Sequence, residues 1–104
     1  MIARTWTGRT KKEHADAYAQ VLHETGLNVM GRTPGNRGAY LLRRIDRQEA
    51  EFLLISLWES IEVVKAFAGQ DAEKARYFPE DDKYLLTRAE HVTHFEVIHA
   101  AALP

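Results

Sequence analysis

Tyr77 lies in a segment whose composition is unusual for a surface connection. The segment EKARYFPEDDKYLL (residues 73–86) holds two tyrosines, a phenylalanine and a proline among four carboxylates. The rings are too apolar for a free loop, and the carboxylates are too charged for a core. We therefore expect a lid along the mouth of a small-molecule pocket, with its rings facing inward and its acids facing outward.

The hydroxyl of Tyr77 is the candidate for chemistry in this lid. A phenol can bind a substrate oxygen, transfer a proton or ligate a metal, so Tyr77 is predicted as a catalytic residue. Tyr84 lies further along the same segment and competes for this place, and it is predicted as a substrate-binding residue. The structural alternative for Tyr77 is a ring packed on the preceding helix with its hydroxyl in water.

A second candidate site depends on how the first and last strands pair. If they are neighbours, Arg4 and Trp6 can share one face of a sheet with His94 and Glu96. Such groups must satisfy one another on a covered face, because an isolated buried charge costs several kcal/mol. The cluster could polarise a phenol or hold an anion, with His94 as the base and Arg4 as a further catalytic group. A structural ion network at a dimer interface is the alternative.

Large aromatic side chains provide candidate walls for a flat ligand. Trp58 ends a buried strand, and Phe67 lies on the helix that follows it. Together with Trp6, these rings are predicted to bind substrate by stacking. Pure core packing is the alternative for Trp58 and Phe67.

No metal or cofactor motif is visible in the sequence. His91, His94 and His99 fall on both faces of one predicted strand, so they cannot all reach one ion. The chain has no cysteine, which excludes disulfides and thiolate chemistry. The glycines of GRTPGNRG (residues 31–38) fit no phosphate-binding pattern. The sequence therefore predicts no metal and no cofactor.

The composition is that of a folded globular chain, and we predict one domain over residues 1–104. Hydrophobic residues make up 45% and charged residues 28% of the chain, and the formal net charge is −1. The sequence shows no basic face interleaved with aromatic residues, so we do not expect nucleic acid as a partner. No apolar run reaches the roughly 20 residues of a membrane span. The start MIARTWTG has no signal pattern, so we expect a cytoplasmic protein.

Periodicity and punctuation predict the elements that position these residues. Strands are expected at residues 2–7, 39–45, 51–58 and 91–99 from β-branched and aromatic alternation. Thr10 and Glu13 form a candidate capping box for a helix from Lys11 to about Thr25, which Gly26 would end. Ser60 can cap a second helix over residues 61–68, which Gly69 would end, and Pro79 can begin a short helical turn.

The order of these elements predicts an α+β ferredoxin-like fold, β-α-β-β-α-β, with an antiparallel sheet. Helices would then cover only one face of the sheet. The run FLLISLW (residues 52–58) is apolar on both faces, however, which indicates a strand that is covered on both sides. We therefore expect a homodimer whose two sheets pack face to face.

Three stretches of the chain resemble one known family. TPGNRGAYLLRR, EFLLISLWESIEVVKAFAG and HVTHFEVI are similar to the antibiotic biosynthesis monooxygenase family of the dimeric α+β barrel superfamily. The resemblance implies a small-molecule pocket between sheet and helices, in a family of cofactor-independent oxygenases of phenols and quinols and of haem-degrading enzymes. Aligned on Trp58, Phe67 replaces a Trp of the haem-degrading branch and Tyr77 replaces its haem-ligating His. Trp6 or a neighbouring threonine replaces an Asn of that branch.

Together these features predict a cofactor-independent monooxygenase that acts on a small aromatic or quinol-like metabolite. Tyr77, His94 and Arg4 would be the polar groups of the site. Two alternatives remain at this point. One is a dimer on the same scaffold that binds a small ligand without catalysis, and the other is a haem-binding protein that lacks the usual haem-degrading residues.

Overall fold

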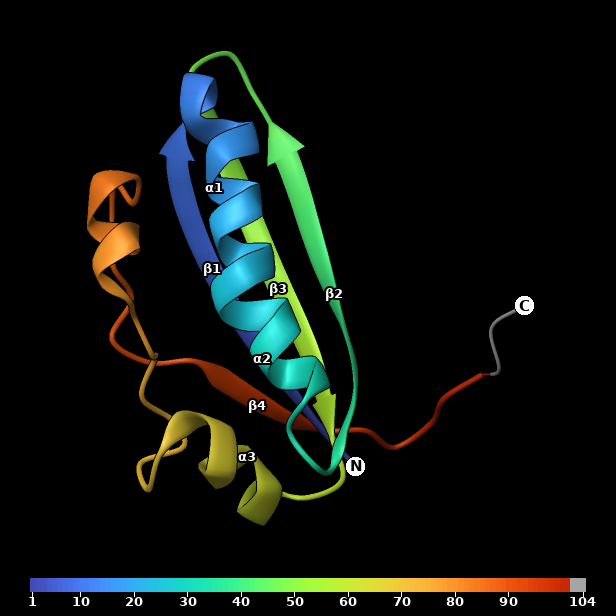
Figure 1. Cartoon of the computed structure of the whole chain (residues 1–104). Coiled ribbons are helices and arrows are strands. Elements are labelled where there is room, and N and C mark those ends of the chain that lie inside the picture. The colour runs from blue at the N-terminus through green and yellow to red at the C-terminus, as the bar shows by residue number, and fades with distance from the viewer. Residues whose placement is uncertain (102–104) are drawn as a thin grey trace.

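The computed structural model describes residues 1–101 and shows a four-stranded antiparallel sheet in the order β2-β3-β1-β4. The strands are β1 (Ile2–Lys11), β2 (Asn36–Ile45), β3 (Glu49–Trp58) and β4 (Thr93–Glu96). The helices are α1 (Ala15–Leu22), α2 (Asn28–Gly31) and α3 (Ile61–Ala68), and all lie on one side of the sheet (Figure 1). The predicted ferredoxin-like fold is confirmed.

Two long central strands organise the sheet. β1 pairs with β3 from Ile2 opposite Trp58 to Lys11 opposite Glu49, and β2 pairs with the other edge of β3. Every second residue of β3 is buried, including Phe52, Leu54 and Trp58. Side chains alternate between the two faces of a strand, so these residues point toward the helices.

The first helical run is longer than predicted. It begins with a 3₁₀ turn at Lys12–His14, continues through α1, passes through a π-helical turn at His23–Leu27 and ends with α2. Gly26 does not end this run, because it lies inside the π-helical turn. Thr10 is buried on β1 and its hydroxyl donates to the carbonyl of Lys11, so the predicted capping box is wrong. The strand's own pairing with β3 extends through these residues and displaces the helix start.

The second helix has the predicted bounds, residues 61–68. The hydroxyl of Ser60 accepts a hydrogen bond from the backbone N–H of Val63 at 3.4 Å, as an N-cap does. Gly69 follows the helix with a φ of 96°, which is a backbone conformation that glycine adopts at low cost. These two signals explain why the sequence located α3 correctly.

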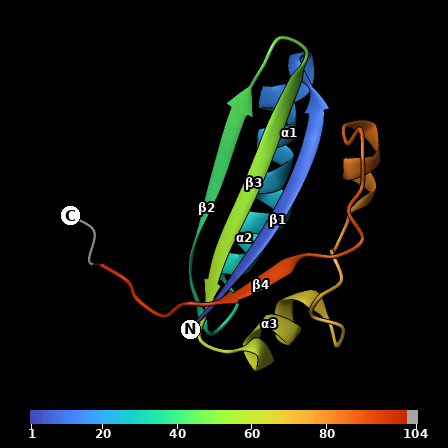
Figure 2. The ribbon, with the colours of Figure 1, turned by 180° about the vertical axis from the view of Figure 1, so that it is seen from behind.

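A long connection between α3 and β4 packs against the edge of β1 and the end of α1 (Figure 1). It contains a 3₁₀ helix at Pro79–Lys83, which begins at the predicted proline. β4 is shorter than predicted, because only residues 93–96 form strand structure and only Ile2–Thr5 of β1 pair with them. Beyond Glu96 the backbone extends away from the body of the protein (Figures 1 and 2).

The core divides into two clusters on the helix side of the sheet. One gathers Trp58, Val64 and Phe67 beneath α3, and the other gathers Tyr18, Leu22 and Phe52 beneath α1. Trp6 and Leu41 pack against both clusters. No helix among residues 1–101 is both long and apolar enough to cross a membrane.

The opposite face of the sheet carries no helix in the described part of the chain (Figure 2). Its residues include Leu53, Ile55 and Leu57 of β3, which are partly buried. Tyr40 and Leu42 of β2 lie opposite Ile55 and Leu53 and are 49% and 45% exposed. Toward the other end of the same face, Arg9 forms ion pairs with three carboxylates, those of Asp46, Glu49 and Glu51.

The indole of Trp6 lies across Gly8, its neighbour on the same face of β1. A Cβ atom added at Gly8 would lie 2.7 Å from Cζ2 of Trp6 and 3.0 Å from Leu85. Gly8→Ala should therefore displace Trp6 and lower the free energy of unfolding by about 1–3 kcal/mol. Urea denaturation measures this change. Gly31→Ala is the control, since a Cβ there meets nothing within 4 Å, and equal stability of the two variants would contradict the packing described.

Candidate functional site

A cavity of about 60 Å³ lies between the sheet, the helical run and the long connection. Its walls are mostly apolar, and they come from β1, β3, α1, α2, α3 and the segment around Tyr77. The apolar lining residues are Trp6, Leu22, Met30, Leu54, Phe67, Phe78 and Val92. The polar ones are Arg4, Tyr18, Thr25, Arg76, Tyr77 and Asp81.

Arg4 is the buried cation of this cavity. It lies on β1 opposite Ser56 of β3 and His94 of β4, and its side chain points to the helix side. Its guanidinium donates to the carbonyl oxygens of Ala72 and Lys74 in the connection, the latter at 3.3 Å. Burial lowers the pKa of Arg4 to about 10, and at neutral pH the group stays charged.

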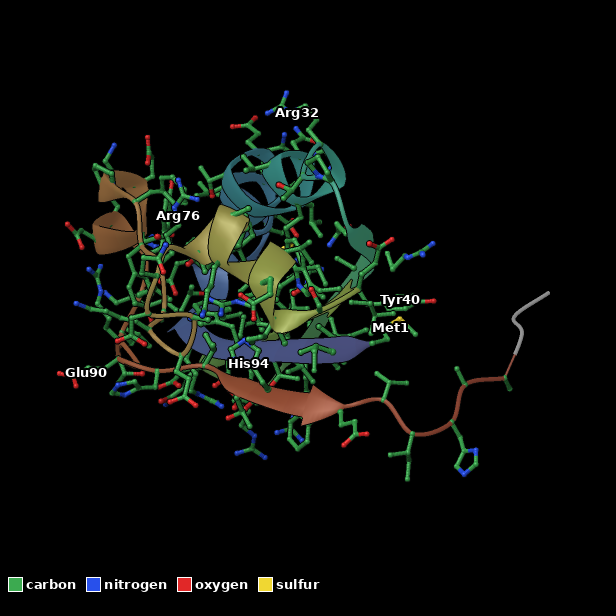
Figure 3. The ribbon with its side chains drawn as sticks, turned by 90° about the horizontal axis from the view of Figure 1, so that it is seen from below. Met1, Arg32, Tyr40, Arg76, Glu90 and His94 are labelled. Carbon is green, nitrogen blue, oxygen red and sulfur yellow. The ribbon has the colours of Figure 1, made fainter. Side chains whose placement is uncertain are left out.

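His94 supports Arg4 from β4. Nε2 of His94 lies 3.2 Å from Nη1 of Arg4. A guanidinium can only donate, so Nε2 accepts and the ring is neutral in this arrangement. Burial, and then the charge of Arg4, hold the pKa of His94 below its usual value. His94 is not among the residues that line the cavity, and Figure 3 shows it beside β1 and β4.

Tyr77 and Trp6 form a hydrogen-bonded pair across the cavity wall. The indole Nε1–H of Trp6 donates to the Tyr77 hydroxyl at 3.1 Å, and that hydroxyl donates to the carbonyl of Ala89 at 2.6 Å. The guanidinium of Arg88 lies 4.4 Å from the centre of the Tyr77 ring, within the range of a cation–π contact. Tyr77 is therefore held at its hydroxyl and on its ring.

Asp81 is a buried carboxylate, contrary to the prediction for the lid. The acids of the lid were expected to face outward, but Asp81 is only 3% exposed and lines the cavity. One of its oxygens accepts from the Tyr18 hydroxyl at 2.9 Å, and the other accepts from the backbone N–H of Phe78 at 2.7 Å. Burial, and then the Asp81 carboxylate, raise the pKa of Tyr18 far above its usual value, so Tyr18 remains a donor.

Arg76 contributes a second guanidinium near the opening. It donates to the carbonyl of Phe67 at 2.5 Å and lies over the rings of Phe67 and Phe78. Figure 3 shows Arg76 on the helix side of the sheet, beside α3. Arg76 is exposed as a whole, so its charge is partly in water, unlike that of Arg4.

A larger outer hollow of about 400 Å³ lies on the far side of Tyr77. It is lined by polar residues of the connection, among them Lys74, Arg88 and His91. Tyr77 lines both this hollow and the inner cavity. The side chain of Tyr77 therefore lies at the boundary of the two spaces.

The structure brings together four of the seven predicted site residues. Arg4, Trp6, Phe67 and Tyr77 line the cavity. The shared face predicted for the first and last strands is present, since Arg4 lies opposite His94 and Ile2 lies opposite Glu96.

Two of the predicted substrate-binding residues lie elsewhere. Trp58 is fully buried in the core, where Nε1 donates to the hydroxyl of Ser56 at 2.9 Å and the ring packs on Phe67. Tyr84 packs between His14 and Tyr18. Neither lines the cavity.

Several lining residues were not predicted as part of a site. Thr25 and Gly26 reach the cavity from the π-helical turn, and such turns often occur at functional sites. No sequence signal locates a π-helical turn. Asp81 lies two residues after Pro79, which starts a helix, and this position predicts an acid that faces solvent. Such a position suits a solvated acid, and only packing shows that it is buried.

Comparison with known proteins agrees with this arrangement. The family model described as antibiotic biosynthesis monooxygenase matches residues 1–77 of the chain. The chain belongs to this family. The match ends at Tyr77, so it includes β1 to α3 and stops before the 3₁₀ helix and β4. A comparison with curated proteins found no match.

Solved structures share the fold at low sequence identity. A protein of Nitrosomonas europaea named as an antibiotic biosynthesis monooxygenase superposes with a TM-score of 0.70 at 14% identity, covering 95% of this chain and 100% of that one. A Bacillus cereus protein of the same name gives 0.65 at 17% identity, covering 98% and 97%. The haem degrader MhuD of Mycobacterium tuberculosis, solved with two haems in its active site, gives 0.60 at 20% identity, covering 98% and 100%.

Removing the titration of His94 should change how stability depends on pH. The folded protein binds a proton at His94 less readily than the unfolded chain, so stability falls as the pH drops below about 6.5. In His94→Gln the side-chain oxygen can still accept from Arg4, but the proton uptake is lost. Urea denaturation between pH 7 and pH 5 should show a shallower loss of stability than in the wild type.

His23→Gln is the matched control, since His23 is exposed on the helical run. It should keep the pH dependence of the wild type. An unchanged slope in His94→Gln would show that His94 is not the titrating group.

Proposed function

We propose that this protein is a cofactor-independent monooxygenase of a small aromatic, quinol-like metabolite. The main support is Arg4, a charged guanidinium that is 4% exposed and faces an aromatic cavity. Its hydrogen-bonding partners are carbonyl oxygens and a neutral imidazole. A phenolate or semiquinone oxygen would meet a positive charge there, in surroundings that screen it little.

The chemistry needs an anionic substrate and molecular oxygen. A quinol that has lost a proton can pass electrons to O₂ directly, so the protein has only to bind, orient and help deprotonate it. In the overall reaction a ring C–H becomes C–OH and the quinol becomes a quinone. One oxygen atom of O₂ enters the product and the other leaves as water, so that 1,4-dihydroxynaphthalene would give 2-hydroxy-1,4-naphthoquinone.

The size of the cavity requires the lid to move. Its volume of about 60 Å³ is well below the roughly 300–1,000 Å³ of typical small-molecule pockets. The outer hollow is separated from it by Tyr77, whose hydroxyl is held by Trp6 and Ala89. A substrate would enter past Tyr77, and its ring would lie between Trp6 and Phe67. In this proposal Tyr77 guards the opening, and His94 holds Arg4 in place.

Oxygen uptake with a quinol tests this function. The wild type should consume O₂ with 1,4-dihydroxynaphthalene faster than the same solution without protein. Arg4→Gln should lower kcat/KM by about 10²-fold, because it removes the charge that stabilises the anion. Arg32→Gln, at an exposed position after α2, should leave the rate unchanged.

Two results would contradict the enzyme. One is the absence of oxygen uptake with any quinol or phenol of a panel. The other is thermal stabilisation of the protein by such compounds without turnover, which would favour the non-catalytic ligand-binding dimer instead.

Haem binding fits the described residues poorly. The residues that line the inner cavity include no histidine or cysteine within the described part of the chain. Tyr77 could ligate ferric haem as a phenolate, but its hydroxyl is taken by Trp6 and Ala89, and a porphyrin is far larger than the cavity. Titration with hemin decides this point, since a visible absorption band that Tyr77→Phe abolishes would support haem binding.

We propose further that the protein is a homodimer, with a second copy on the open face of the sheet. Tyr40 and Leu42 of β2 and Phe95 of β4 expose between 45% and 54% of their surface on that face, beside Leu53 and Ile55 of β3. Such a continuous apolar sheet surface is uncommon on a monomer. The same face of a second copy would cover it through a two-fold axis.

The backbone beyond β4 supports the same proposal. It extends away from the body, and Ile98 on it is 76% exposed (Figure 1). An extended segment with an exposed apolar side chain could pack along a second copy.

Charge placed on the open face should separate the two copies. Leu42→Lys puts an ammonium into the apolar surface, and burying it against a second copy would cost several kcal/mol. Sedimentation velocity should show a dimer for the wild type and a folded monomer for Leu42→Lys. Ala17→Lys, on the exposed side of α1, should remain a dimer. A compact wild-type monomer in dilute solution would contradict the proposal.

A further inference from the structure

Arg4 and Asp81 are buried, oppositely charged and face the same cavity, yet they do not touch. They are 4% and 3% exposed. Among residues 1–101, neither has an oppositely charged side chain within 4.0 Å. Neutral partners satisfy both of them instead. A buried charge is costly and usually lies against its counter-ion, so this separation needs a reason.

The two charges reach the cavity from different elements, Arg4 from β1 and Asp81 from the 3₁₀ helix at Pro79–Lys83. Arg4 lies on β1 opposite Ser56, whereas Gly8 lies opposite Phe52. The centres of the Tyr18 and Phe52 rings lie 5.4 Å apart, and the Tyr18 hydroxyl donates a hydrogen bond to Asp81. Four residues along a strand span roughly 13 Å, so the backbone of Arg4 and the position on β1 opposite Phe52 are well separated. Trp6 lies between them on the same face of β1.

We propose that the substrate is an aromatic ring with two oxygen substituents para to each other, that Arg4 binds one oxygen, and that Asp81 accepts the proton of the other. This inference rests on the proposed oxidation of quinols and adds to it the base and the substitution pattern of the substrate. A ring held in this way lies against Trp6, with its two polar ends on the two charges. The ligand would thereby bridge two charges that do not contact each other.

Asp81 has the hydrogen-bonding capacity for this step. Its carboxylate has about four acceptor positions, and Tyr18 and the backbone of Phe78 occupy two of them. Tyr18 keeps its own proton because burial raises its pKa. When the substrate O–H bond breaks, its proton moves to Asp81 and its electron pair stays on the phenolate oxygen. The proton can then be returned to the oxygen atom of O₂ that leaves as water.

The outer hollow belongs to the route into the same site. The open face of the sheet is already assigned to the second copy. The charged cluster around Arg9 is neutralised by its own ion pairs. Asp81 remains as a buried group for which the proposed oxidation has no other use.

Asp81→Asn tests the base because it keeps the shape and one of the two acceptor oxygens but cannot take the proton. With 1,4-dihydroxynaphthalene, oxygen uptake should fall by about 10²-fold or more. Anaerobic calorimetry should show that the variant still binds the quinol within about tenfold of the wild type. Glu80→Gln, exposed on the same 3₁₀ helix, should behave as the wild type.

The substitution pattern is tested on the wild type alone. 1,4-Dihydroxynaphthalene should bind anaerobically about tenfold or more tighter than 1-naphthol, which lacks the second oxygen, and than 1,4-dimethoxynaphthalene, which has no proton to donate. These measurements need no variant, so they decide the matter even if Asp81→Asn does not fold.

Wild-type oxygen uptake that Asp81→Asn retains would overturn Asp81 as the base and leave the proposed function standing. Equal affinity for the three ligands would overturn the bridging substrate. Tight and selective quinol binding without oxygen uptake would overturn the proposed oxidation and, with it, Asp81 as its base.

Discussion

The buried guanidinium of Arg4 is the interaction on which the site depends. β1 is a central strand, and Arg4 reaches from it to the carbonyl oxygens of Ala72 and Lys74 in the connection between α3 and β4. One side chain therefore links the connection that covers the cavity to the sheet on its other side. The partners are neutral, so this link leaves a positive charge at the cavity wall. The same contacts that stabilise the fold thus create the electrostatic environment of the site.

The connection between α3 and β4, which covers the cavity, is held by a few hydrogen bonds and packs on aromatic rings. Tyr77 is held by Trp6 and Ala89, and Asp81 is held by Tyr18. Each bond is worth only about 0.5–1.5 kcal/mol net in a folded protein, or somewhat more where a charge takes part. A connection held in this way can close the cavity in the absence of ligand and still open at a modest cost in free energy. This suits the proposed oxidation, which would have to admit a ring and then exclude water from its anion.

Side chains alternate between the two faces of the sheet, so one face carries the candidate site and the other carries an apolar surface. The helix side of β1 carries Arg4 and Trp6 and builds the site. The other side of the sheet carries the apolar surface that includes Tyr40 and Leu42. A shift of one residue in the pairing of β1 would exchange these faces and remove the site. The ten-residue pairing of β1 with β3 holds that register.

The sequence was sufficient for the elements with strong local signals. Ser60 and Gly69 marked both ends of α3, and Pro79 marked the start of the 3₁₀ helix. Alternating apolar residues located the strands and hence the ferredoxin-like order. Four predicted site residues line the cavity: Arg4 and Trp6 were predicted from a covered sheet face, Phe67 from the helix after Trp58, and Tyr77 from the aromatic lid segment.

Long-range packing was needed for the rest, because burial and strand register are not local properties of a chain. Gly26 reads as a helix end, yet the helical run continues through it in a π-helical turn. Asp81 reads as a solvated helix start, yet Tyr18, 63 residues earlier, holds it inside the cavity. Its burial comes from contacts between segments far apart in the chain, and no pattern of neighbouring residues encodes such contacts.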